Sequence, residues 1–231
     1  MTVTEEHAEL GVLYIVPTPI GNLGDITIRA LEVLKAVDAV AAEDTRTTKF
    51  LLDHFQIQKP LLSFFSHNEQ IRVPQIIERL KQGESIAIVS DAGTPGISDP
   101  AYSIITAAIE QEIRIVPLPG ATAFVPVLVA SGLSTHEFVF IGFLPHKKGR
   151  KTKLESLVEE KKTIVLYESP HRIVKTLQEL MNYLGDRKAV IGREMTKKFE
   201  ELTRGTLSSL ITDYSSRSIK GEFVVVVEGK Q

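Results

Sequence analysis

The stretch IAIVSDAGTPGISDP, residues 86–100, gives the first indication of the fold. It begins as an apolar strand, Ile86 to Val89, and continues as a loop of glycine, proline and threonine with Asp91 near its start and Asp99 near its end. A strand that is apolar on both sides is typical of a parallel sheet covered by helices on both faces. Glycine-rich loops after such strands usually bind phosphate, but this loop carries two carboxylates and no lysine or arginine.

The rest of the first half repeats this alternation of strand and helix. Further short apolar runs occur at residues 12–18, 39–44, 61–65 and 113–118. Between them, apolar residues recur at helical spacing, as do Phe50, Leu51 and Phe55 on one segment. Fully apolar strands that alternate with amphipathic helices predict a parallel α/β sheet.

The second half contains both kinds of element in a less regular order. We expect strands at residues 138–144, 163–169, 188–194 and 222–229, and helices at residues 121–133, 151–160 and 171–184. The runs FVFIGF and FVVVV within these strands are expected to lie in the core. The turn PLPG, residues 117–120, is the expected domain boundary. It separates an N-terminal domain, residues 11–118, from a C-terminal domain, residues 119–231, and residues 1–10 are expected to form a loose tail.

Three helix starts have recognisable caps. Thr27 is expected to cap the first helix through its side-chain oxygen. Asp99 and Ser169 each precede a proline, so each is expected to act as an N-cap with proline at the first helical position.

Composition excludes several classes of protein. The chain of 231 residues has no cysteine, which excludes disulfides and thiolate metal sites and fits a reducing cytoplasm. No apolar run reaches the ~18–20 residues that a membrane helix needs. The first ten residues are acidic and lack the apolar region of a signal peptide. The six histidines show no HxxxH or HxH spacing, so we expect no metal site.

Charge is distributed unevenly along the chain. The net charge is −2, but residues 1–118 carry 9 Lys+Arg against 16 Asp+Glu, and residues 119–231 carry 18 against 13. The net charge is therefore −7 in the first half and +5 in the second. This difference indicates either a polyanionic partner for the second half or a chance distribution of surface charge.

Polar loops follow most of the predicted strands. They are residues 17–25, 43–46, 91–99, 117–122 and 168–172, with a longer polar stretch at 192–205. Ligands of open α/β sheets bind beyond the carboxyl ends of the strands. If both halves are α/β units, these loops are expected to converge on one interdomain cleft.

The chemistry of the loop at residues 91–99 narrows the choice of ligand. Neither GxxxxGK[ST] nor GxGxxG is present. Asp91 would repel a phosphate but suits hydroxyl groups or a cation, and S-adenosylmethionine combines ribose hydroxyls, an amino-acid head and a positive sulfur. The alternative interpretation is a tight turn whose aspartates cap helices.

Eight stretches together resemble a known family. They are LYIVPTPIGNLGDIT, VDAVAAEDTR, SDAGTPGISDP, PGATA, SGL, GFLP, YESPHR and GREMTKKFEELTRG, in this order between residues 11 and 229. The chain resembles the tetrapyrrole-methylase superfamily and, within it, the ribosomal RNA small-subunit methyltransferase I family. Members of that family often continue into a small helical C-terminal segment, whereas this sequence ends at Gln231.

The resemblance implies a fold, a reaction and a site. The fold would be two α/β domains, with a parallel sheet in the first, a mixed sheet in the second and the active cleft between them. The reaction would be methyl transfer from S-adenosylmethionine to the 2′-oxygen of a cytidine in 16S rRNA, by a cytoplasmic homodimer acting on the RNA or the small ribosomal subunit. The positions that match the family's cofactor site are Pro17, Pro19, Asp91, Gly93, Thr94, Ile97, Thr122, Ala123, Tyr167 and Met195.

A ribose hydroxyl is a poor nucleophile, so a base that takes its proton would help by roughly 10²–10⁴. Glu43 is the expected base because it ends the second strand and matches an acidic catalytic position in related enzymes. Asp44 is the alternative, and either acid could instead pair with Arg46 and only shape the loop.

Basic residues of the second half are the main expected RNA contacts. The cluster HKKGRKTK, residues 146–153, is the strongest, although such runs are often solvated helix starts. The expected set is Arg46, Lys147, Lys148, Arg150, Arg172, Arg193, Lys197 and Arg204. Two other functions stay open: a methylase of tetrapyrroles or other small molecules, and a non-catalytic RNA-binding module.

Overall fold

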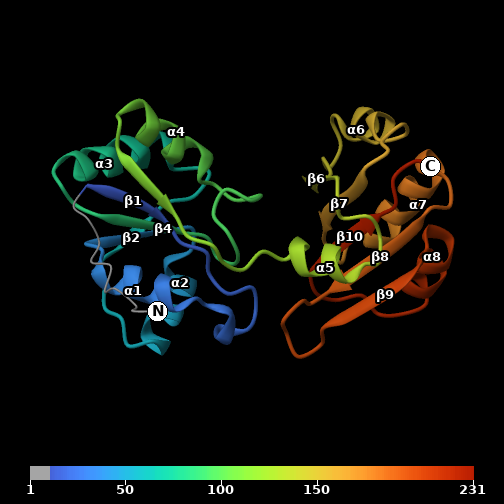
Figure 1. Ribbon diagram of the computed structural model, residues 1–231, viewed down its shortest axis with the longest axis horizontal. Helices are drawn as coiled ribbons and strands as arrows, with labels where there is room; N and C mark the ends of the chain where they lie inside the picture. The colour runs from blue at the N-terminus through green and yellow to red at the C-terminus, as the bar shows by residue number, and fades with distance from the viewer. Residues whose placement is uncertain (1–10) are drawn as a thin grey trace. The chain divides into compact units, whose positions relative to one another are not determined.

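The computed structural model describes residues 11–231, and the expected tail at residues 1–10 lies outside the described residues. The chain divides into two compact units, unit 1 up to Thr122 and unit 2 from Ala123 onward (Figure 1). The boundary predicted from the sequence lies four residues earlier, after Leu118.

Unit 1 is built on a parallel sheet of five strands. The strands are β1 (Val12–Ile15), β2 (Ala39–Ala42), β3 (Leu61–Ser63), β4 (Ile86–Val89) and β5 (Arg114–Pro117). Their order in the sheet is β3-β2-β4-β1-β5, and every pair is parallel. The predicted parallel α/β sheet is therefore confirmed.

Helices cover both faces of this sheet, which explains why its central strands are apolar throughout. The helices are α1 (Ile28–Ala36), α2 (Thr45–His54), α3 (Glu69–Lys81) and α4 (Tyr102–Glu110), with a short 3-10 helix, η1 (Leu23–Asp25), after β1. One core packs Tyr14 of β1 against Val33 of α1 and Leu52 of α2. The other packs Leu13 of β1 against Leu80 of α3 and Ile104 of α4. Figure 1 shows the two pairs of helices on opposite faces.

Unit 2 is built on a mixed sheet of five strands. These are β6 (Phe138–Phe143), β7 (Thr163–Glu168), β8 (Lys188–Arg193), β9 (Glu201–Thr206) and β10 (Phe223–Val227), in the order β6-β7-β10-β8-β9. Only the β6–β7 pair is parallel, and it contains a bulge between Phe140 and Gly142. The predicted mixed sheet is confirmed, but β9 lies in a stretch that was expected to be a loop.

The helices of unit 2 are α5 (Phe124–Ala130), α6 (Arg150–Ser156), α7 (Ile173–Leu184) and α8 (Leu207–Ser215). The main core packs Leu154 of α6, Leu177 of α7 and Leu210 of α8 against Leu166 and Val225 of the sheet. Helix α5 contacts β7, β8 and β10. Its Val127 leaves no room for a side chain at Gly192, because a Cβ there would lie 2.3 Å from a Val127 methyl carbon.

Two expectations about strands and caps are wrong. The FVVVV run is buried throughout, as predicted, but FVFIGF is an edge strand with Phe138 41% and Phe143 52% exposed. Thr27 caps α1 as predicted, accepting a hydrogen bond from the Ala30 amide. The residues before α4 and α7 are Ala101 and Arg172, neither with a side-chain cap, because the helices begin later than the expected caps at Asp99 and Ser169.

Candidate functional site

The loops after β1 and β4 are joined by backbone hydrogen bonds. The Thr18 amide donates to the Gly93 carbonyl over 2.9 Å, and the Gly93 amide donates to the Thr18 carbonyl over 3.0 Å. Thr18 is 3% exposed, and its hydroxyl donates to the Ser90 carbonyl over 3.0 Å. Gly93 has a φ of +89°, a conformation that glycine adopts without strain. The first predicted loop is thus fixed against the loop that contains Asp91.

The loops after β4 and β5 are joined by two threonine hydroxyls. Thr94 Oγ1 lies 2.9 Å from the Ala121 carbonyl and 2.9 Å from Thr122 Oγ1. A hydroxyl has one proton, so when Thr94 donates to the carbonyl it accepts from Thr122. Ile97 closes the turn through its amide, which donates to the Thr94 carbonyl. Thr94 and Thr122, predicted to line one pocket, are therefore in contact.

The loops after β2 and β4 are joined through two carboxylates. Asp91 Oδ1 accepts a hydrogen bond from the Asp44 amide over 2.9 Å. The Glu43 carboxylate lies near enough to Asp91 for the negative charge of Asp91 to act on its pKa. The loop contact therefore places the expected base, Glu43, beside the expected ligand-binding acid, Asp91.

The acids of this region differ in how readily they hold a proton. Burial raises the pKa of Glu43, and the nearby negative charge of Asp91 raises it further. Burial, followed by the charge of Glu43, raises the pKa of Asp99 to about 6. Hydrogen bonds from Arg46 hold the pKa of Asp44 down at about 2. Glu43 is therefore the better proton acceptor of the two candidate bases, and Asp44 is held in its ionised form.

A cavity of about 320 Å³ opens in unit 1 beside these loops. Its lining includes Thr18 and Pro19 from the first loop, Ser90 and Asp91 from the β4 loop, and Phe50 from α2. Phe50 is 66% exposed, although its helical spacing with Leu51 and Phe55 predicts the apolar face of an amphipathic helix. The buried face of α2 consists of Thr48, Leu51 and Leu52 instead.

The remaining positions of the expected cofactor site fall in different places. Pro17 is buried against Gly120, where a Cβ would lie only 2.4 Å from the Pro17 Cβ. Ala123 begins unit 2 and precedes α5. Tyr167 in β7 contacts the ring of Phe140 at 5.1 Å, and Met195 after β8 is 8% exposed. Tyr167 and Met195 thus belong to unit 2, whereas the connected loops described above belong to unit 1.

Two of the expected RNA contacts, Arg150 and Arg172, form ion pairs within unit 2. Arg150 is 6% exposed, and its guanidinium binds Glu179 Oε2, over 2.6 Å at the closer nitrogen, and Thr176 Oγ1 over 2.7 Å. Arg172 binds the buried Glu168 carboxylate over 2.7 Å. These guanidinium groups form ion pairs inside unit 2: Arg172 supplies the counter-charge of the buried Glu168, and Arg150 pairs with the half-buried Glu179.

The other basic candidates are nearer the surface. Arg193 and Lys197 are part-buried and form ion pairs with Glu201 and with Glu194, respectively. Arg204 lies on strand β9 and donates to the Ala130 carbonyl. The Arg46 side chain is 90% exposed and pairs with Asp44. Lys147 and Lys148 are exposed and form no ion pair with any residue from 11 to 231.

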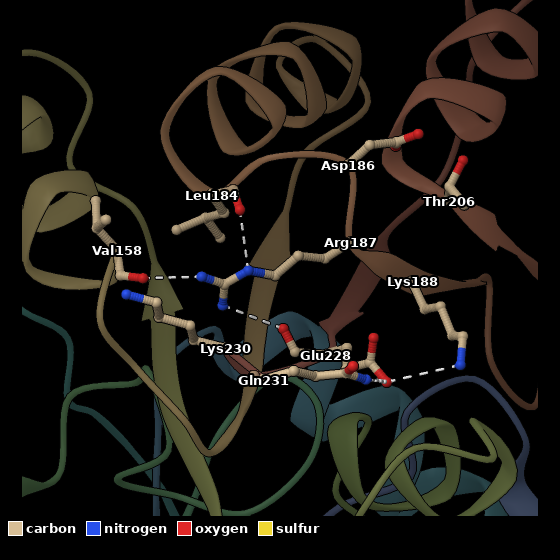
Figure 2. A pocket seen from close by; sticks show the side chains of 10 residues that line it. Val158, Leu184, Asp186, Arg187, Lys188, Thr206, Glu228, Lys230 and Gln231 are labelled. Atoms are coloured by element: carbon tan, nitrogen blue, oxygen red, sulfur yellow. Dashed lines mark hydrogen bonds and ion pairs between the residues drawn. The ribbon is translucent and has the colours of Figure 1, made fainter.

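A second cavity, of about 570 Å³, lies in unit 2 near the end of β10 (Figure 2). Arg187 lies in it and donates to the carbonyls of Val158 over 2.8 Å and Leu184 over 3.1 Å. The Lys188 ammonium pairs with Glu228 at 3.8 Å. None of the expected site residues lines this cavity, and its arginine is bound to main-chain carbonyls.

Sequence reasoning missed three contributors to the site. Ser90 and Thr18 are buried polar residues that connect the loops, and Phe50 stands at the cavity rim. A polar residue at the end of a buried strand was a usable signal for Ser90, whereas nothing in the helical spacing distinguished Phe50 from a core residue. Within the described part of the chain, no group of three or more His, Cys, Asp or Glu residues is arranged to hold a metal ion, and no helix is long and apolar enough to cross a bilayer.

Comparison with protein families assigns the class. The family model of tetrapyrrole (corrin/porphyrin) methylases matches residues 12–211. The chain therefore belongs to the tetrapyrrole methylase family.

Its similarity to individual proteins is more specific. A Haemophilus influenzae protein named ribosomal RNA small subunit methyltransferase I is 50% identical over 225 residues, which cover 95% of this chain and 79% of that protein. The Bacillus subtilis protein of the same name is 49% identical over 223 residues, which cover 96% of this chain and 76% of that protein.

Solved structures share the fold at low sequence identity. Cobalt precorrin-4 methyltransferase superposes with a TM-score of 0.71 at 19% identity, covering 94% of this chain and 95% of that one. Uroporphyrin III C-methyltransferase from Thermus thermophilus superposes with a TM-score of 0.66 at 15% identity. The match covers 94% of this chain and 97% of that one.

Proposed function

We propose that this chain transfers a methyl group from S-adenosylmethionine to the 2′-oxygen of a cytidine in 16S rRNA. The observation that carries the proposal is the contact between the β2 and β4 loops, in which Asp91 Oδ1 accepts the Asp44 amide and Glu43, an acid with a raised pKa, lies beside the exposed Asp91 carboxylate. Relatives of nearly 50% identity are named ribosomal RNA small subunit methyltransferase I, which supports RNA as the substrate.

The groups that line the site fit S-adenosylmethionine. The cavity lining includes a carboxylate and several hydroxyls and no lysine or arginine, which suits a ligand with a positive centre and ribose hydroxyls. Asp91, Thr94 and Thr122 would hold the cofactor, with Pro17, Pro19, Gly93, Ile97 and Ala123 around it. In unit 2, Tyr167 and Met195 are the positions that the family resemblance assigns to the adenine. When bound, this cofactor supplies a methyl group on a positive sulfur that needs no further activation.

Glu43 would take the proton of the ribose hydroxyl. The bound cofactor would supply the methyl group to the 2′-oxygen, and the hydroxyl proton would pass to the Glu43 carboxylate. A raised pKa makes a carboxylate a stronger base, so the environment of Glu43 favours this transfer. Asp44 has the opposite environment, because Arg46 stabilises its ionised form.

We also propose the setting in which the enzyme works. Its partner would be 16S rRNA, free or in the small ribosomal subunit, and its location would be the cytoplasm, where ribosomes are assembled. We propose a homodimer, as the family resemblance implies, which sedimentation of the purified protein would test directly.

The test combines cofactor binding with position-specific detection of methylation. Calorimetry with S-adenosylmethionine should show binding, and absence of binding contradicts any methyltransferase function. Small subunits from a strain lacking the enzyme should then be incubated with protein and cofactor and examined by primer extension at low nucleotide concentration. A new stop at one cytidine supports the proposal. Cofactor binding without any new stop would favour a small-molecule methylase instead, and RNA binding without cofactor binding would favour a non-catalytic module.

A further inference from the structure

The end of strand β6 presents an aromatic ring to solvent. Phe143 is 52% exposed although it ends an apolar run, and its ring contacts Tyr167 at a centroid distance of 5.6 Å. Strand β6 lies at the edge of its sheet, and the bulge before Gly142 changes the register that leads to Phe143. Packing of the core does not account for a ring in this position.

A groove of about 500 Å³ separates the end of β6 from helix α6. Phe143 and Pro145 line it from the strand side, and Thr152 and Lys153 line it from the helix. We call this groove, together with Lys147 and Lys148 of the connecting loop, the β6–α6 surface.

The β6–α6 surface carries excess positive charge. Among residues 145–156, Lys147, Lys148 and Lys151 are exposed and Lys153 is half-buried, against a single acid, Glu155. Lys151 lies 3.7 Å from Glu155, whereas the other three lysines form no ion pair with any described residue. The charge of these lysines is therefore available to an anionic partner.

Two arginines of unit 2 bind the backbone of the segment that leads into the loop with these lysines. Arg150 Nη1 donates to the Pro145 carbonyl over 3.1 Å, and Arg172 Nη1 donates to the Leu144 carbonyl over 3.1 Å. Arg150 is held by the half-buried Glu179 and the buried Thr176 of α7, and Arg172 by the buried Glu168 of β7. The segment that follows Phe143 is thus fixed before any partner binds, which lowers the entropy lost on binding.

We propose that the β6–α6 surface binds a single-stranded stretch of RNA near the methylated nucleotide, with one base stacked on Phe143 and phosphates bound by Lys147 and Lys148. This inference rests on the proposed function. An exposed ring beside free cations is the arrangement that proteins use for unpaired nucleotides, since every base has a face that can stack. Four residues span at most about 14 Å, so the ring and the first lysine are within reach of a few consecutive nucleotides.

The experiment separates stacking from phosphate binding. Affinity for a short fluorescein-labelled oligocytidine RNA is measured by anisotropy over a series of KCl concentrations, with an RNA duplex of the same length as a second probe. The variants are Phe143→Leu and the double change K147A with K148A. The matched controls are Phe138→Leu, an exposed ring at the other end of β6, and K161A with K162A, two lysines that precede β7.

The two variants are expected to fail in different ways. Phe143→Leu should weaken single-strand binding about 5-fold or more without changing its salt dependence, because stacking carries no charge. The double lysine change should reduce the slope of log affinity against log salt by about 1.4, at roughly 0.7 for each phosphate that is no longer neutralised. The control variants should bind as the unmodified protein does, and all proteins should bind the duplex more weakly.

Three results would overturn the inference. One is unchanged single-strand binding by both site variants while the unmodified protein still methylates small subunits, which leaves the proposed function standing. The second is weaker binding to the small subunit without any change toward RNA, which would indicate a protein partner. The third is no RNA binding and no methylation by the unmodified protein, which removes the proposed function as well. Circular dichroism melting of each variant identifies any that fails to fold.

Discussion

The substitution Asp91→Asn tests whether the β4 loop recognises a positive sulfur. An asparagine at this position would keep an oxygen that accepts the Asp44 amide, a hydrogen bond of 2.9 Å in the structure, while removing the negative charge. The connection between the β2 and β4 loops is therefore retained, and the variant isolates the electrostatic contribution of the carboxylate.

The expected size follows from charge and exposure. Two opposite unit charges about 4 Å apart attract by about 4 kcal/mol at an effective dielectric near 20, while fully exposed pairs contribute below about 1 kcal/mol. Asp91 is exposed but would be partly covered by a ligand, so we expect an intermediate loss of about 1–2 kcal/mol. This corresponds to a dissociation constant about 5- to 30-fold higher for S-adenosylmethionine.

The assay compares two ligands by titration calorimetry. S-adenosylhomocysteine, the demethylated product, has a neutral sulfur, so its affinity should stay within about twofold in Asp91→Asn. Asp53→Asn, a change of an exposed acid on α2, should alter neither affinity. Equal weakening for both ligands would show that Asp91 acts on the ribose or on the loop, and an unchanged affinity for both would place the cofactor elsewhere.

Three further outcomes are expected. Glu43→Gln should slow single-turnover methyl transfer by about 10²–10⁴-fold at unchanged cofactor affinity, and the rate of the unmodified protein should fall as pH falls through the raised pKa of Glu43. If Glu43→Gln loses less rate than Asp44→Asn does, Asp44 is the base. Arg150→Ala should lower the free energy of urea unfolding by about 2–3 kcal/mol, because Glu179 and the buried Thr176 hydroxyl lose their partner, whereas Lys151→Ala should change it by less than about 0.5 kcal/mol; equal values would contradict the structural role. Asp99 has a pKa of about 6 when folded, above the ordinary 3.8, so the folded protein loses stability as pH rises between these values. At neutral pH, the free energy of urea unfolding of Asp99→Asn should therefore exceed that of the unmodified protein by about 1 kcal/mol. The full pKa difference would correspond to about 3 kcal/mol, which is reduced because the carboxyl group is partly exposed. At about pH 3.5 the two proteins should be equally stable, and a constant difference at both pH values would exclude titration as the cause.

Much of the fold follows from local pattern. Buried strands such as β4 and β10 are uniformly apolar, and their positions are evident from the sequence because both faces of their sheets are covered. Strand β9 is different, since its residues are half-buried or exposed at a sheet edge and alternate too weakly to distinguish it from a loop. The exposure of Phe143 has the same origin, because edge position and the bulge are properties of the sheet.

The site was less predictable than the fold. The loops with Asp91, Thr94 and Thr122 could be grouped in advance because they follow parallel strands, whose carboxyl ends meet at one edge. Arg150 could not be separated from its basic neighbours, since its partner Glu179 lies 29 residues away and one turn of helix decides which side chain faces inward. The raised pKa of Asp99 depends on burial and on Glu43, neither of which its own loop reveals.

The bulge in strand β6 also bears on the behaviour of the protein at high concentration. An open strand edge offers unpaired amides and carbonyls to other chains, and a run such as FVFIGF carries no charge to discourage aggregation. Gly142, with a φ of +66°, interrupts the ladder within this run and bends the edge. A second copy that paired with this edge would meet an interrupted ladder, so this one irregularity disfavours aggregation through an apolar, uncharged edge.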